Sequence, residues 1–205
     1  MKIRLPLIMI ALMTLKANGQ KLSYTPDLLL GNRSYAYMHN VNYHFNSYLK
    51  INNLILFDTE YANDKENIFF IRNTLSYSIS RKISFNAAVG IKNPGKFFGL
   101  FAQYRTIGSD YSLSYSMGTT YQRTFTLEQS IAFEYTPNIT EQLDGYFHVL
   151  AIVNLEPGNY QRGLQQVRLG LKQRRLNYGL ALNLDQWNNN EKQLYNTGIF
   201  IKHNF

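Results

Sequence analysis

The final stretch of the chain, YNTGIFIKHNF at residues 195–205, alternates between two kinds of side chain. The largely apolar or aromatic set, at every second position, consists of Tyr195, Thr197, Ile199, Ile201, His203 and Phe205. The set between them consists of Asn196, Gly198, Phe200, Lys202 and Asn204. Because successive side chains of a β-strand point to opposite faces, this period of two predicts a strand whose faces meet different environments. The pattern predicts that the strand continues to Phe205.

The same alternation recurs through almost the whole chain. In YSLSYSMGTTY, residues 111–121, apolar or aromatic residues alternate with serine and glycine. Eleven such segments lie between residues 34 and 205, separated by stretches rich in Asn, Gly, Pro and charge. Two are irregular, because both phases are apolar at residues 143–153 and only three apolar residues keep the period at residues 163–172. No helical periodicity follows the first twenty residues, so the sequence predicts a single all-β domain over residues 20–205.

The first twenty residues, MKIRLPLIMIALMTLKANGQ, have a different character. Lys2 and Arg4 precede an apolar run over residues 5–15, and small residues follow as far as Gly19. This layout is typical of a secretory signal peptide, so we expect residues 1–19 to be removed on export. An uncleaved anchor helix is the alternative, but a membrane-spanning helix needs roughly 20 apolar residues and this run is shorter.

The composition excludes several classes of protein. The chain has no cysteine, which rules out disulfides, thiolate metal sites and a lipidated N-terminal cysteine. Its formal charge of +8 would fall by three with the signal peptide, and the remaining cations are scattered singly. Nucleic-acid binding favours clustered basic residues, so we expect no nucleic-acid partner. We also expect no cofactor and no metal.

A sheet of this pattern is compatible with a soluble sandwich, a soluble barrel with an apolar interior, or a membrane barrel with an apolar exterior. Three features favour the membrane barrel. First, the predicted segments span about 9 to 13 residues, whereas a tilted membrane-crossing strand needs roughly 9 to 11 and soluble strands average about 5 or 6. Second, tyrosines on the apolar phase lie near segment ends, where lipid meets water. These are Tyr35, Tyr61, Tyr104, Tyr111, Tyr121, Tyr135 and Tyr195.

The third feature is the polarity of the opposite phase, which is too charged for a protein core. We expect this phase to face the lumen of a barrel, with the charges Arg72, Glu128, Glu134, Arg168, Lys172, Asp185 and Lys202. These charges either pair to fill a narrow lumen, because isolated charges away from water are costly, or line a polar channel. Several glycines fall on the same phase, where they either admit long side chains from across the lumen or leave space for solute.

Together, the signal peptide, the long alternating strands, the tyrosine boundaries and the terminal Phe205 resemble the small outer-membrane β-barrel proteins of Gram-negative bacteria. This resemblance implies a closed antiparallel barrel surrounded by outer-membrane lipid. It also implies that the final strand and its aromatic end are read by the outer-membrane assembly machinery. His203 departs from that signal, since an apolar or aromatic residue is more usual there.

The resemblance further implies an even number of strands, with both termini in the periplasm. Eleven segments do not satisfy this, so residues 21–31, KLSYTPDLLLG, are predicted to supply a first strand that turns at Asn32 and Arg33. Twelve strands are therefore favoured. Ten is the alternative if this segment and one irregular segment are misread.

For function, we expect a structural or transport role, with a narrow pore for ions or small solutes as the leading hypothesis. The first alternative is a non-conducting barrel that serves as a partner in an envelope complex, and the second is a barrel enzyme acting on lipid or peptide. Catalytic chemistry needs a nucleophile, a base and an orienting group within reach, and the four histidines show no such arrangement. His148 is the least certain, because its segment does not reveal which way it faces. We therefore predict no catalytic residue.

Overall fold

The computed structural model describes residues 22–62, 65, 67–93, 95–187 and 192–205, and the predicted signal peptide lies outside them. Within this part, no helix is long and apolar enough to cross a membrane. The described residues form thirteen β-strands. They are β1 (Leu22–Gly31), β2 (Ser34–His44), β3 (Leu49–Glu60), β4 (Ile68–Ser78), β5 (Ile83–Lys92), β6 (Gly95–Ile107), β7 (Tyr111–Tyr121), β8 (Phe125–Tyr135), β9 (Asn138–Thr140), β10 (Leu143–Glu156), β11 (Asn159–Gln173), β12 (Leu176–Trp187) and β13 (Lys192–His203).

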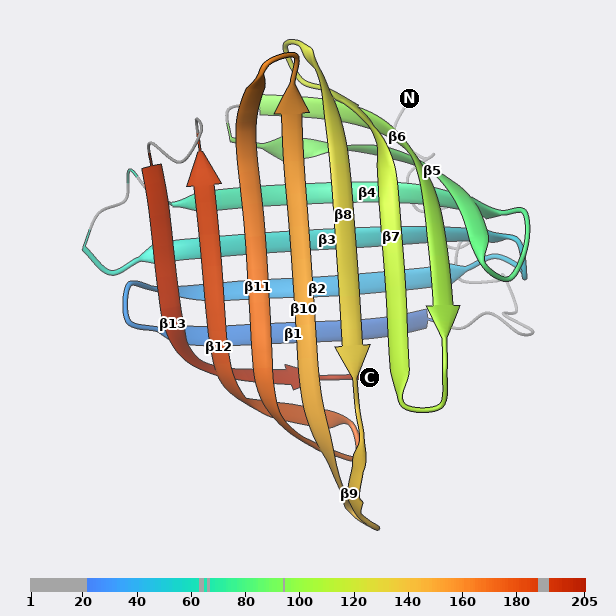
Figure 1. Ribbon diagram of the computed structural model, residues 1–205, viewed down its shortest axis with the longest axis vertical. Helices are drawn as coiled ribbons and strands as arrows, with labels where there is room; N and C mark the ends of the chain where they lie inside the picture. Colours follow the sequence, from blue (N-terminus) through green and yellow to red (C-terminus); the bar gives the residue numbers. More distant parts are fainter. Residues whose placement is uncertain (1–21, 63–64, 66, 94, 188–191) are drawn as a thin grey trace, which may run out of the picture.

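Twelve of these strands form a closed antiparallel barrel. Each pairs with its neighbours in chain order, β10 pairs with both β8 and β11, and β13 returns to pair with β1. The three-residue β9 pairs only with the start of β10 and stands outside the ring. Figure 1 shows β7–β12 crossing in front of β1–β6, the view expected for tilted strands seen from the side. The predicted closed barrel is confirmed.

The strand count of twelve is also confirmed. Residues 22–31 form β1, and both irregular segments form strands, β10 and β11, which are 14 and 15 residues long. Pro26 fits in β1 because the pairing with β13 begins only at Asp27, so the missing N–H of proline removes no hydrogen bond from that ladder. The ten-strand alternative is wrong.

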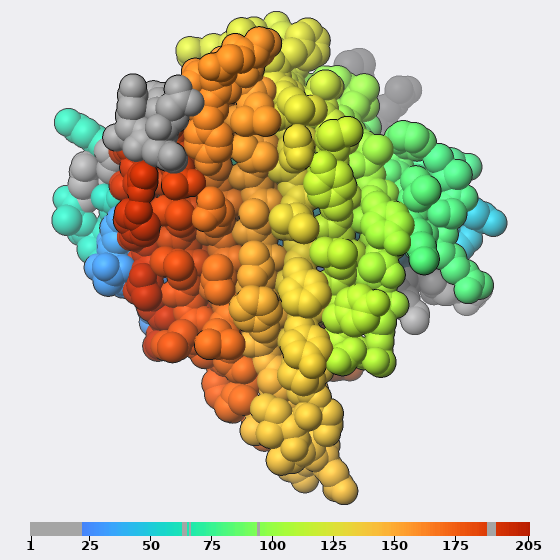
Figure 2. Space-filling view, viewed as in Figure 1, coloured from blue at the N-terminus to red at the C-terminus, as the bar shows by residue number. Residues whose placement is uncertain are grey.

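The apolar phase of the strands covers the outside of the barrel. Large apolar side chains in mid-strand are solvent-exposed, including Leu30, Phe57, Leu75, Val89, Leu100, Met117, Ile131, Leu169, Leu180 and Ile199. All seven predicted boundary tyrosines are exposed as well. They lie near the two ends of the strands, with Tyr35, Tyr61, Tyr121 and Tyr195 toward one end and Tyr104, Tyr111 and Tyr135 toward the other. Figure 2 shows the outer wall as a continuous surface of side chains, with the β9 arm projecting beyond it.

The interior holds the opposite phase, together with several aromatic rings that the alternation does not single out. Phe101 on β6 is 4% exposed, and a Cβ on Gly99 of the same strand would stand 2.6 Å from its ring. A Cβ on Gly118 of β7 would clash with the backbone carbonyl of Leu100 and stand 2.7 Å from the Phe101 ring. At these two positions, glycine makes room for the neighbouring ring and backbone rather than leaving space for solute.

The barrel closes along a seam between β13 and β1. Asn196 on β13 is fully buried, and its amide accepts hydrogen bonds from the backbone N–H groups of Arg33 (3.2 Å) and Ser34 (3.3 Å). The same amide donates to the carbonyl (3.1 Å) and hydroxyl (2.7 Å) of Ser34. At the other end of the seam, the Phe205 ring stacks on Tyr24, and its N–H donates to the Tyr24 carbonyl at 3.0 Å. The last and first strands are therefore joined by side chains as well as by the ladder.

Candidate functional site in the lumen

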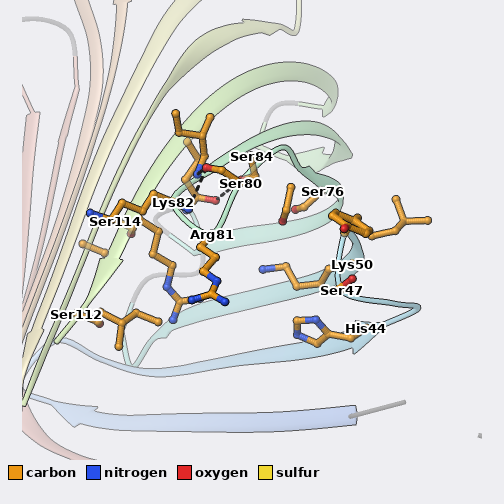
Figure 3. A pocket seen from close by; sticks show the side chains of 18 of the residues that line it. His44, Ser47, Lys50, Ser76, Ser80, Arg81, Lys82, Ser84, Ser112 and Ser114 are labelled. Atoms are coloured by element: carbon orange, nitrogen blue, oxygen red, sulfur yellow. Dashed lines mark hydrogen bonds between the residues drawn. The ribbon is translucent and has the colours of Figure 1, made fainter. Parts of the chain in front are cut away.

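A polar hollow of the interior opens at the end of the barrel where the first strand, β1, begins and the last strand, β13, ends. We call it the vestibule; its volume is about 500 Å³. It is bounded by the turn between β2 and β3, the turn between β4 and β5, and the neighbouring ends of β6, β7, β8 and β10. Figure 3 shows it at close range, with side chains from these elements directed into a common space.

Four cationic side chains line the vestibule: Lys50, Arg81, Lys82 and Arg105. Lys50 lies on the inward phase of β3, in register with His44 on β2 and Ser76 on β4. The backbone N–H of Arg105 donates to the carbonyl of Lys82 at 2.7 Å, which fixes the β4–β5 turn beside β6. Figure 3 shows the Lys50 ammonium and the Arg81 guanidinium directed into the same space. Cations from two strands and one turn thus share one space.

Hydroxyl and amide groups make up most of the remaining lining. Seven serines contribute, namely Ser47, Ser76, Ser78, Ser80, Ser84, Ser112 and Ser114. Deeper in, the amide of Asn86 donates to Gln103 at 3.1 Å, and Asn52 donates to Asn40 at 3.3 Å. These small polar groups leave the hollow open and offer hydrogen bonds to whatever enters.

The inner wall of the vestibule carries its one acidic lining residue, Glu134 on β8. The ammonium of Lys202 on β13 lies 3.4 Å from this carboxylate and donates to the hydroxyl of Tyr146 at 2.9 Å. That hydroxyl donates to Glu134 at 3.3 Å, and the Tyr146 ring is parallel to His148. His148 therefore faces the lumen. It lies beside a polar cluster of Glu134, Tyr146 and Lys202, which links β8 to β13.

The middle of the lumen is narrow. A cavity of about 80 Å³ there has an apolar layer of side chains from β2–β4 and, on the opposite wall, from β10 and β11, namely Met38, Leu54, Leu56, Ile68, Phe70, Leu150, Ile152 and Leu164. Polar and charged side chains complete its lining, namely Arg72, Lys92, Glu128, Asn154, Arg162 and Gln166. Beside this apolar layer, the guanidinium of Arg72 lies 3.0 Å from Glu128 and 4.5 Å from the centre of the Phe101 ring. The layer and the ion pair together separate the vestibule from the far end of the barrel.

Three ion pairs, made by two arginines, occupy the end of the barrel opposite the vestibule. Arg33 in the β1–β2 turn pairs with Asp58 at 2.8 Å and with Glu60. Arg162 pairs with Asp185 through two nitrogens, at 2.5 and 3.0 Å, and its guanidinium lies 4.9 Å from the centre of the Trp187 ring. These groups neutralise one another and brace this end.

Six of the seven charges predicted to line the lumen take part in four ion pairs. Arg72 meets Glu128, Lys202 meets Glu134, and Asp185 meets Arg162. Arg168 is 3% exposed, and its Nε lies 3.7 Å from Asp27, which the alternation did not single out. Lys172 is half-buried near the end of β11, where it is in register with Asp144 on β10 and Asn177 on β12.

The vestibule cations were not among the predicted lumenal residues. Lys50 and Arg105 do stand on the inward phase of their strands, so the alternation contained the signal. They lie near segment ends, however, and only the barrel brings those ends around one hollow. In the described ranges no group of three or more His, Asp or Glu side chains is placed to hold a metal ion.

Comparison with known proteins identifies the fold only. No protein-family profile matches the chain, and no curated protein is significantly similar to it in sequence. The solved structure of the KdgM porin superposes with a TM-score of 0.57 at 8% identity, over 89% of this chain and 99% of that one. The KdgM porin in complex with disordered oligogalacturonate gives a TM-score of 0.55 at 9% identity, with the same coverage. The chain has the outer-membrane β-barrel fold.

A third solved structure, an outer membrane channel from Pseudomonas putida F1, gives a TM-score of 0.47 at 9% identity. It covers 91% of this chain and 95% of that one.

Proposed function

We propose that the protein is an integral outer-membrane barrel that forms a narrow conduit for small solutes, entered through the vestibule. The observation that carries this proposal is the vestibule itself, a polar hollow of about 500 Å³ inside a barrel whose outer wall is apolar. Membrane barrels that conduct solutes likewise have a polar interior behind an apolar outer wall.

Placement in a membrane is supported by the outer surface. A soluble protein rarely exposes a contiguous apolar patch beyond a few hundred Å², whereas here large apolar side chains are exposed on strands all around the ring. Tyrosines at both ends of this belt suit the two lipid–water boundaries. A closed ring also leaves no unpaired strand edge in the lipid.

The similarity in fold to the KdgM porin supports a transport role, because a porin of nearly the same extent is built on the same kind of barrel. We take only the general role of transport from this similarity. The class of solute must be inferred from the side chains that line this lumen.

The test is single-channel recording of the refolded protein in planar bilayers. We expect small, discrete conductance steps, since the apolar layer in mid-lumen narrows the path. Complete absence of current, with the protein shown to be folded by heat-modifiable migration on a gel, would contradict the proposal.

The apolar layer also favours a second candidate, a barrel that passes no solute and serves as a partner within the envelope. Leu54 and Leu150 face one another from opposite walls around the cavity of about 80 Å³. Apolar constrictions of this kind exclude water and ions. A folded barrel that stays silent in bilayers, even after this layer is opened, would establish the second candidate instead.

Opening the layer is itself a prediction. The double substitution Leu54→Ser, Leu150→Ser is expected to raise single-channel conductance by roughly threefold or more, because it both widens and wets the constriction. The matched control is Leu54→Met, Leu150→Met, which conserves volume and apolarity and should leave conductance near the native level. Equal conductance in the two variants would show that this layer does not limit the current.

A further inference from the structure

We infer that the vestibule binds solutes through a phosphate group. This inference rests on the proposed function for its meaning in transport, since it names the class of solute, but the binding site itself would exist in a sealed barrel too. The binding site combines positive charge, convergent geometry and hydrogen-bond donors.

The charge of the vestibule is strongly positive. Lys50, Arg81, Lys82 and Arg105 line it, against a single acidic residue, Glu134. That carboxylate already has a cation of its own, because the Lys202 ammonium lies 3.4 Å away. Among the described residues, none of the salt bridges involves any of the four vestibule cations. Their charge is therefore available to a ligand.

The geometry concentrates that charge instead of dispersing it. Lys50 and Arg105 line the same hollow, so their positive charges repel one another across it. Lys50 is half-buried at its position on β3, so bulk water screens this repulsion only in part. A bound anion would convert this mutual repulsion into two attractions. Elsewhere in the lumen Arg72, Arg162, Arg168 and Lys202 each have a carboxylate partner, whereas no salt bridge of the described residues involves the vestibule cations.

The donors around the cations suit a tetrahedral oxyanion. Arginine and lysine together recognise phosphate, arginine through its planar fork and lysine as a point charge. Serine hydroxyls on several sides of the hollow, among them Ser76, Ser84 and Ser114, supply further donors for oxygens that point in different directions. A group with two negative charges and several oxygens uses this arrangement better than a single carboxylate does. The volume of about 500 Å³ also leaves room for an attached small organic portion.

The experiment uses the full mature chain refolded in detergent and titrated with inorganic phosphate by isothermal calorimetry. The variant Lys50→Gln, Arg105→Gln should bind phosphate at least about tenfold more weakly, because it loses two charge-assisted contacts. The control Lys96→Gln, Arg175→Gln removes the same net charge from exposed positions outside the vestibule and should bind as the native protein does. Equal weakening in both variants would reduce the effect to overall charge and overturn the inference.

A second readout does not depend on calorimetry. The chain has no cysteine, so Ser114→Cys introduces one thiol into the vestibule. Phosphate should slow modification of this thiol by a small methanethiosulfonate reagent, and acetate at equal ionic strength should slow it less. Identical protection by both anions, or by neither, would overturn the assignment to phosphate.

The source of the phosphate is separated by competition. Displacement of phosphate by glycerol phosphate would indicate a soluble solute, whereas displacement only by phosphatidic acid in the micelle would indicate a lipid headgroup. Phosphate binding in a barrel that never conducts would contradict the proposed conduit and support this site. Conduction without phosphate binding would support the conduit and contradict the site.

Discussion

Replacing Arg168 by alanine is expected to destabilise the folded barrel by about 3–5 kcal/mol, because it leaves a buried carboxylate without its cation. Asp27 is 6% exposed, and Arg168 on β11 reaches it across β12 and β13. The arginine also donates to Asn183 at 2.8 Å and lies over the Phe200 ring. The free energy of unfolding is measured by urea titration in lipid vesicles, with the folded fraction read from heat-modifiable migration.

The double variant Asp27→Asn, Arg168→Met provides the control for charge. It removes both members of the pair and fills the space with groups of similar size, and replacement of a whole buried pair is often neutral. We expect it to recover most of the stability lost in Arg168→Ala. A double variant as unstable as the single one would show that packing and the Asn183 contact matter more than the unpaired charge of Asp27.

Replacing Asn196 by alanine is expected to cost about 3 kcal/mol, because the fully buried Ser34 would lose the partners of its backbone N–H, carbonyl and hydroxyl groups. The loss falls on the seam between β13 and β1, where the ring closes. Besides lower stability in urea, we expect a larger share of protein that fails to reach the folded band after dilution into vesicles.

Asn42→Ala is the matched control for the seam. Asn42 also points inward but lies at the open end of β2, and its amide donates to Ser23 at 3.4 Å. Its removal should change stability by less than about 1 kcal/mol. If the two variants unfold at the same urea concentration, the side-chain bridge of Asn196 is not what holds the ring closed.

Much of this architecture was predictable because strand periodicity is a local property. The apolar phase of the last strand, with Ile199 and Ile201, proved to be the outer face, and the boundary tyrosines are exposed. The requirement for an even strand number identified residues 22–31 as a strand despite Pro26. The irregular pattern of β10 has a physical reason as well, because Leu150 and Ile152 on its inward phase belong to the apolar layer across the lumen.

The partners of the inward charges were not predictable in the same way. Arg72 on β4 meets Glu128 on β8, and Lys202 on β13 meets Glu134 on β8, so each pair spans the lumen between strands that do not touch. Such contacts depend on the diameter and stagger of the ring, which no single strand contains. The same holds for Asp27 on β1, because its cationic partner, Arg168, belongs to β11, and β12 and β13 lie between the two strands.

By itself, the sequence determined the all-β class, favoured twelve strands over ten, and identified the lipid-facing side of the regular strands, since these follow from a period of two residues and from the closed barrel with an even strand number that the resemblance implies. Only the tertiary structure decided that the lumen narrows at an apolar layer in its middle and widens into a cationic vestibule at one end. Closure of the ring brings Lys50 and Arg105 around one hollow and Leu54 against Leu150, and contacts across a lumen depend on three-dimensional spacing that local periodicity does not encode.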